Sequence, residues 1–311
     1  MTQAHQNDDE PNRQVMSHAS ALAALHVAVA LFGFAALFGK WLALPATAIV
    51  LARTILAAAT LAAVARVRNV PLGRGDRRLF VNGAILAAHW VAFFAAVQAG
   101  GVAIALLGYA VFPVFVLVLE HRLGDDRSGV RGWASALLAT LGLVALVPDL
   151  AWTNGATRGV VLAVASAFTF AWLAVRNRAL VAKRPAIDIA LWQNLFAAAC
   201  LVPVTIAIAG RAALPTPTEL GLLIVLGTLC TGVSHTLFIA SMRRLSAHTA
   251  GVVAALEPVY GIALAALLLH EMPNARTIVG GVVIVGAALE ATRRVEVGDA
   301  TAVSVASSPR E

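Results

Sequence analysis

The chain is a series of long apolar runs separated by short polar segments. A helix needs about 20 apolar residues to cross the hydrocarbon core of a bilayer, and ten runs approach this length. They cover residues 20–38, 46–65, 79–98, 101–119, 131–148, 158–175, 187–209, 219–241, 248–269 and 275–292. A lipid-exposed backbone must form its own hydrogen bonds, and the runs lack the alternation of transmembrane strands. The pattern therefore predicts an all-α integral membrane protein with ten transmembrane helices.

Composition agrees with this interpretation. Of the 311 residues, 60% are hydrophobic and 13% are charged, whereas a soluble domain carries about 25% charged residues. The same figures exclude a largely disordered chain, which would be poor in apolar residues and rich in charge. The formal net charge of +7 would suggest a nucleic-acid partner only if the basic residues had no other explanation.

The basic residues are explained by membrane topology. With the N-terminus inside, 18 of the 23 Lys and Arg residues fall in cytoplasmic segments, as the positive-inside rule requires. Both termini are therefore predicted to be cytoplasmic, and no nucleic-acid partner is expected. Because arginine and alanine are abundant, we expect a prokaryotic cell (inner) membrane.

The two halves of the sequence resemble each other. Leu51-Ala52-Arg53 resembles Leu191-Trp192-Gln193, Gly83 matches Gly227, and Pro113-Val114 matches Pro258-Val259. Alanine-rich helices match each other easily, but several matches in the same order favour a repeat. Five helices per half is an odd number, so the second half would be inverted relative to the first, as in many secondary transporters.

This organisation predicts two helical halves between two polar ends. The expected segments are a disordered cytoplasmic tail at 1–18, a first five-helix half at 19–148, a second five-helix half at 158–292, and a second disordered cytoplasmic tail at 295–311.

The second half resembles the EamA-type permeases of the drug/metabolite transporter superfamily. The resemblance rests on Ala255-Leu256-Glu257-Pro258-Val259, on His270-Glu271 and on Gly280-Gly281, and Arg53 fits the family's arginine in the second helix. It implies ten helices and transport of a small metabolite, with export as the expected direction. The first half departs from the pattern, because Glu120 follows Pro113 by seven residues and Glu271 follows Pro258 by thirteen. Whether Glu120 is equivalent to Glu271 stays open.

Glu257 and Arg53 lie in the interior of apolar runs, where charge is costly and usually functional. Glu257 falls near the middle of its run, next to Pro258, which breaks or kinks a helix. It could couple transport to a proton or cation, or be a structural carboxylate. Arg53 is the only Lys or Arg that lies away from the ends of a run. It could bind a substrate carboxylate, pair with Glu257, or extend toward the interface.

Polar and aromatic side chains in the runs are the candidates for lining a substrate site. Each could instead be an ordinary packing residue. These candidates are His89, Trp90, Tyr109, Trp172, His235 and Tyr260.

The chain shows no motif of an enzyme. It contains no nucleophile elbow, zinc-protease motif or ATP-binding P-loop, and Cys200 and Cys230 have no disulfide or metal-ligand spacing. We therefore expect no catalytic residue, cofactor or metal. The expected partners are a small-molecule substrate, the bilayer and, as a candidate coupling ion, the proton, and we expect a monomer. The alternative function is a non-transporting membrane sensor or accessory protein on the same scaffold.

Overall fold

The computed structural model describes residues 16–122, 130–146, 153–210, 214–245, 250, 253–254 and 256–292, and all regular secondary structure among these residues is helical. The first part of the chain forms α1 (His18–Trp41), α2 (Ala46–Val67), α3 (Arg77–Gly100), α4 (Val102–Tyr109), α5 (Phe112–Arg122) and α6 (Val130–Leu146). The second part forms α7 (Gly155–Val181), α8 (Ala186–Ala209), α9 (Pro217–Gly227), the π-helical turn η2 (Thr228–Val233), α10 (Ser234–Ser241), α12 (Glu257–Leu268) and α13 (Ala275–Thr292).

Seven helical segments in the described part of the chain are long and apolar enough to cross a membrane. They coincide with the predicted runs one to four and six to eight. The other three runs contain α6, α12 and α13, whose described apolar stretches are shorter. The fold is thus a multi-helix membrane fold, and the total of ten spans stays a prediction.

Two predicted runs, 101–119 and 248–269, each contain a turn followed by a helix start. The chain turns at Ala110 and Val111 between α4 and α5, and α12 begins at Glu257. In both cases the second residue of the new helix is a proline, Pro113 or Pro258. Proline lacks a backbone N–H and is tolerated in the first turn of a helix but not in its interior. Each proline therefore marks a helix start within a run.

Side-chain caps fix the beginnings of other helices. The Asp76 carboxylate accepts a hydrogen bond from the Leu79 N–H at the start of α3. At the start of α9, Thr216 and Glu219 form a reciprocal capping box, which satisfies N–H groups that have no partner within the helix.

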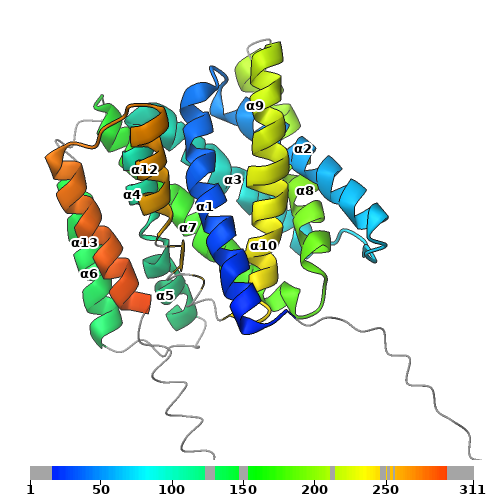
Figure 1. Cartoon of the computed structure of the whole chain (residues 1–311), viewed down its shortest axis with the longest axis horizontal. Coiled ribbons are helices and arrows are strands. Elements are labelled where there is room, and N and C mark those ends of the chain that lie inside the picture. The colour runs from blue at the N-terminus through cyan, green and yellow to red at the C-terminus, as the bar shows by residue number, and fades with distance from the viewer. Residues whose placement is uncertain are drawn as a thin grey trace, which may run out of the picture.

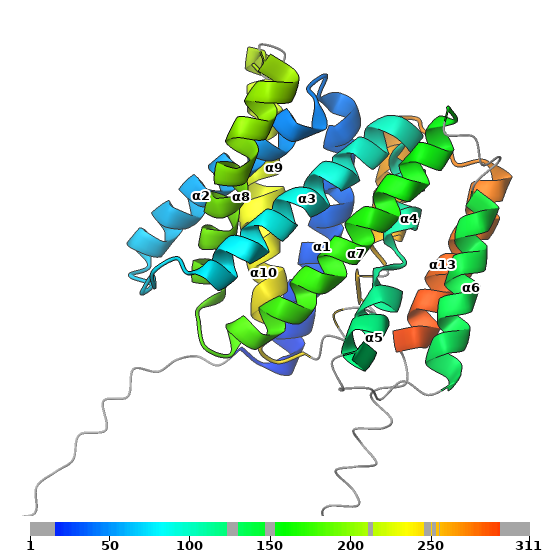
Figure 2. The same cartoon turned by 180° about the vertical axis from the view of Figure 1, so that it is seen from behind.

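The helices pack in pairs that are distant in sequence. Helix α3 lies along α7 and α8, and α2 packs on α8. Helices α6 and α13 lie side by side at one edge of the molecule in both views (Figures 1 and 2). Helix α1 packs against both α10 and α12. The mid-parts of α1, α2, α3 and α7 therefore converge in the interior.

The predicted polar tails lie outside the described residues, apart from residues 16–18. Helix α1 begins at His18, where the Ser17 side chain accepts a hydrogen bond from the Ser20 N–H.

Candidate functional site

A small internal cavity lies where helices from both parts of the chain converge. Its volume is about 30 Å³, close to the share of liquid volume that one water molecule occupies. The lining includes six of the eight residues proposed from sequence: Arg53, His89, Trp90, Tyr109, His235 and Glu257. Since His89 and Trp90 fall near the middle of α3, the cavity lies far from both ends of the bundle.

Arg53 extends from α2 across the bundle to η2. It is 2% exposed; its Nε donates to the Thr231 hydroxyl at 2.9 Å, and its Nη2 donates to the Cys230 carbonyl at 3.4 Å. The guanidinium carbon also lies 4.1 Å from the centre of the Trp90 ring, a cation–π arrangement. Its hydrogen-bond partners are neutral groups, so the positive charge is held in place without being neutralised.

The partners of Arg53 depend on an irregular turn. In η2 the helix widens to π geometry, and the Thr231 hydroxyl also donates to the Leu226 carbonyl at 2.6 Å. Such π turns are rare in proteins as a whole, but those that occur often lie at functional sites. Here the turn presents one hydroxyl and one carbonyl to the guanidinium.

Glu257 is the first residue of α12 and is 4% exposed. Its Oε2 atom is buried without a hydrogen-bond partner among the described residues. An unpartnered buried polar atom costs about 1–3 kcal/mol, and more when the group is charged. Glu257 and Arg53 line the same cavity but form no ion pair in the described structure. The cavity thus contains a carboxyl group with free acceptor capacity.

His89 is held against α7. Its Nδ1 lies 2.8 Å from the Ser166 hydroxyl and 3.0 Å from the Ser166 carbonyl oxygen. Its ring lies 4.9 Å from that of Phe170 and 5.6 Å from that of Tyr109, measured between ring centres. These contacts fix the ring orientation at the cavity wall.

His235 connects the cavity to a buried chain of amides. Its Nε2 lies 3.1 Å from the Gln193 side-chain oxygen, and the Gln193 amide nitrogen donates to the Asn177 oxygen at 2.5 Å. The Asn82 amide donates to that same Asn177 oxygen at 3.0 Å, and Arg176 donates to Asn82. Buried polar networks of this kind rigidify the elements they join, here α3, α7, α8 and α10.

Trp172 and Tyr260 do not line the cavity. Trp172 is 44% exposed on α7 and packs near Phe168, while Tyr260 is partly buried on α12. The structure therefore separates these two aromatic residues from the other six candidates.

Three phenylalanines belong to the cavity wall although sequence reasoning did not select them. They are Phe32, Phe93 and Phe170. Phe32 lies in α1, Phe93 in α3 and Phe170 in α7. Thr231 was also missed, because a π turn has no sequence signal.

The arrangement can recognise opposite charges within an aromatic enclosure. A guanidinium without a carboxylate partner and a carboxyl group with an unpartnered oxygen border the same space. Desolvated groups of this kind interact strongly with a polar ligand, because the local dielectric is low. The present cavity is too small for a metabolite, so binding would require the surrounding helices to separate.

Comparison with known proteins finds similarity to transporters in part of the chain. Residues 157–292 match the EamA-like transporter family. Protein RarD of Escherichia coli is 26% identical over 197 residues, which are 63% of this chain and 65% of RarD. Uncharacterized transporter PA0485 of Pseudomonas aeruginosa is 31% identical over 117 residues, which are 38% of each chain. The matched regions thus span less than two thirds of either relative.

A solved crystal structure of another protein has a similar fold. It superposes on 89% of this chain and on the whole of its own chain, with a TM-score of 0.68 and 21% sequence identity. This likeness concerns the fold alone. The family match is confined to residues 157–292, less than half of the chain, and over those residues the chain is similar to the EamA-like transporter family.

Proposed function

We propose that the protein is a secondary transporter that moves a small polar or amphipathic metabolite across the membrane by alternating access, with export as the expected direction. The observation that carries the proposal is the central cavity, where Arg53 and Glu257 lie buried without pairing. Intramembrane ionisable residues that face a cavity are typical of substrate and ion pathways.

Reciprocal glycine contacts support the inverted repeat on which such a mechanism depends. A Cβ atom at Gly83 of α3 would lie 2.6 Å from the Phe196 Cβ of α8. A Cβ atom at Gly227 of α9 would lie 2.5 Å from the Leu56 Cβ of α2. Gly83 matches Gly227 in the repeat, and Leu56 matches Phe196 at the offset that relates α2 to α8. The same contact is therefore made twice, once in each direction.

Helix pairing has the same reciprocity. Contacts of α3 with α7 are mirrored by those of α10 with α1, and contacts of α5 with α7 by those of α12 with α1. Helices α2 and α8 pack on each other, as do α6 and α13. This is the pattern expected if two inverted halves are related by a pseudo-twofold axis, which places the substrate site between them.

Both ends of the bundle are joined by polar contacts that would have to open in turn. At one end, Lys40 Nζ lies 3.9 Å from Glu271 Oε1, and the Val102 N–H lies 3.4 Å from Glu271 Oε2. At the other end, Arg184 Nη1 of the α7–α8 connection lies 3.6 Å from Asp76 Oδ2 at the start of α3. We propose that the cavity is reached from one side at a time as these contacts separate.

Glu257 is the proposed coupling residue. It lies at the start of α12, where the helix is interrupted, so its surroundings would change if α12 moved relative to α1. A carboxyl group that gains and loses a proton between two such environments can link transport to a proton gradient.

Substrate counterflow tests the proposal. The purified protein is placed in liposomes preloaded with single compounds from a panel of amino acids, nucleosides and amines. Accumulation of the labelled compound above that in protein-free liposomes is the expected result for at least one class. No counterflow across the whole panel, from protein that remains folded, would favour the alternative of a non-transporting sensor.

A further inference from the structure

A second and much larger recess lies away from the central cavity. It is formed where the α2–α3 loop, the α7–α8 connection and the end of α10 meet, and its volume is about 1120 Å³. Five basic residues line it: Arg178, Lys183, Arg184, Arg243 and Arg244. Asp188 is the one acidic residue among the lining residues that the structure describes. The recess is therefore strongly positive.

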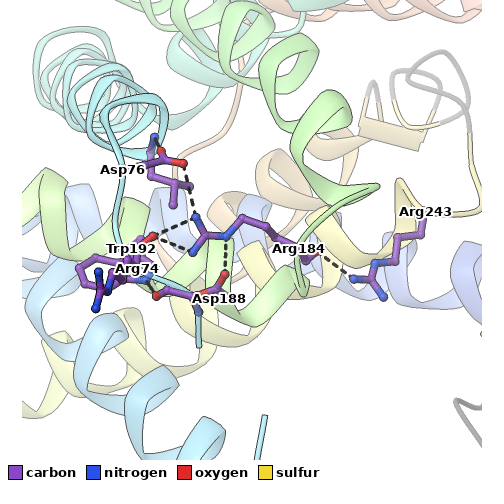
Figure 3. A network of polar contacts seen from close by, with 8 residues as sticks. Arg74, Asp76, Arg184, Asp188, Trp192 and Arg243 are labelled. Atoms are coloured by element: carbon purple, nitrogen blue, oxygen red, sulfur yellow. Dashed lines mark hydrogen bonds and ion pairs between the residues drawn. The ribbon is translucent and has the colours of Figure 1, made fainter. Parts of the chain in front are cut away.

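The carboxylates near the recess already pair with Arg184 (Figure 3). Asp188 Oδ2 lies 2.6 Å from Arg184 Nε, and Asp188 Oδ1 accepts from the Gly73 N–H at 3.1 Å. Asp76 Oδ2 lies 3.6 Å from Arg184 Nη1. These carboxylates offset Arg184, and Lys183, Arg243 and Arg244 contribute further positive charge to the recess.

Hydrogen bonds hold the rim of the recess in a defined shape (Figure 3). Arg243 Nη2 donates to the Arg184 carbonyl at 2.9 Å. Arg184 donates to the Arg74 carbonyl at 3.1 Å, and Trp192 Nε1 donates to the Gly73 carbonyl at 2.9 Å. Helix α8 starts here after Pro185, without a side-chain cap, and a helix N-terminus carries a partial positive charge.

Membrane topology alone does not explain this convergence. The positive-inside rule requires basic residues at one end of the bundle, and Arg66 and Arg68, exposed at the end of α2, satisfy it outside the recess. It does not require five of them to border one concave space.

We propose that this recess binds a phosphate-bearing anion, with the headgroup of an anionic membrane phospholipid as its source. Guanidinium and ammonium groups donate charge-assisted hydrogen bonds to phosphate oxygens. Basic recesses between helices at the cytoplasmic end suit anionic headgroups, and this end is the predicted cytoplasmic one. The lining also includes Leu72, Met242 and Leu245, which offer apolar contact to the glycerol and first acyl carbons. The recess exceeds the space that inorganic phosphate alone would fill.

Lipid binding to the full-length protein tests the proposal. Native mass spectrometry of the detergent-solubilised chain, titrated with phosphatidylglycerol or phosphatidylcholine, measures the affinity of each. We expect preferential binding of phosphatidylglycerol. The double variant Lys183→Gln/Arg244→Gln should weaken it about 25-fold, at about fivefold per basic residue. The matched variant Arg66→Gln/Arg68→Gln removes the same charge outside the recess and should stay within about twofold of wild type.

The variant Lys183→Arg/Arg244→Lys is the control for a folding defect. It changes the same two positions but keeps both charges, so it should keep the binding of phosphatidylglycerol. A second arm measures the melting temperature with added inorganic phosphate. Stabilisation of wild type but not of Lys183→Gln/Arg244→Gln, without lipid preference, would support the same phosphate site with a soluble ligand. Equal affinity for both lipids without a phosphate effect would overturn the proposal, as would equal loss in the recess variant and its matched control.

Discussion

Glu257 lies at the cavity with one carboxyl oxygen that accepts no hydrogen bond from any described residue. The substitution Glu257→Gln keeps the shape of the side chain and most of its hydrogen bonding but removes its ability to ionise. We expect transport to lose its dependence on an imposed pH gradient while the melting temperature stays close to that of wild type. Uptake into liposomes at several internal pH values measures the first, and thermal unfolding in detergent the second.

Glu219 supplies the control for this substitution. It caps α9 outside the cavity, and a glutamine at this position preserves a capping box, so Glu219→Gln should keep the pH dependence. If Glu257→Gln also transports with unchanged pH dependence, Glu257 is only structural. Loss of folded Glu257→Gln protein that is restored by Arg53→Gln would instead show that the two charges balance each other.

Sequence reasoning identified most of the polar side chains that line the cavity. It could not determine which face of a helix points toward the cavity. Trp90 and Trp172 had equal standing because α3 and α7 are apolar on several sides, and both lipid and core favour apolar groups. Packing separates them: Trp90 is 5% exposed beside Arg53, and Trp172 is 44% exposed. The partners of Arg53 were also out of reach, because Thr231 becomes available only through the π turn.

At the scale of single elements, the contact between α1 and α12 is the closest test of packing. A Cβ atom at Gly33 would lie 2.9 Å from the Gly261 backbone nitrogen and 3.0 Å from the Glu257 carbonyl oxygen. Backbone atoms cannot move aside as a flexible side chain can. We therefore expect Gly33→Ala to destabilise the protein by about 1–3 kcal/mol, the usual cost of overpacking, measured as a lower melting temperature in detergent.

Gly221 of α9 is the matched control, since no atom lies within 4 Å of its Cβ position. Gly221→Ala should leave the melting temperature unchanged or raise it slightly, because alanine has the higher helix propensity. Equal melting temperatures for Gly33→Ala and Gly221→Ala would contradict the close approach of α1 and α12.

Most helices could be predicted from the sequence because length and apolarity alone define a run that crosses a bilayer. The interruptions were harder. Pro258 indicates a local break, but hydropathy does not fall at Pro113 or Pro258, so hydropathy does not show where each new helix starts. The breaks become visible only when the backbone shows that each proline begins a new helix.

At the scale of the whole molecule, the distribution of Lys and Arg predicts which end faces the cytoplasm. Cysteines are introduced singly at Lys183 and Ala43, both exposed at opposite ends of the bundle, in a Cys200→Ala/Cys230→Ala background. This background should be tolerated, because Cys230 contacts Arg53 through its carbonyl and not its thiol. We expect a membrane-impermeant thiol reagent to label Ala43→Cys in intact cells and Lys183→Cys only after lysis. The reverse pattern would show that the orientation is inverted.

The repeat could be proposed from the sequence because a few distinctive residues recur in the same order in both halves. The helix contacts that follow from the repeat could not be predicted in this way. That Gly83 meets α8 where Gly227 meets α2 follows from tertiary packing. Substrate identity likewise depends on the shape of an opened cavity, which no sequence pattern describes.

The central claim is that substrate passes through the cavity bordered by Arg53, Trp90 and Glu257. The most direct measurement compares Trp90→Ala with Trp172→Ala in the counterflow assay, using a compound that wild type transports. Both variants remove an indole, but only Trp90 lines the cavity. We expect Trp90→Ala to raise the half-saturating substrate concentration about tenfold or more, Trp90→Phe to have an intermediate effect, and Trp172→Ala to resemble wild type. Folded Trp90→Ala protein with wild-type half-saturation, or an equal effect of Trp172→Ala, would contradict the account.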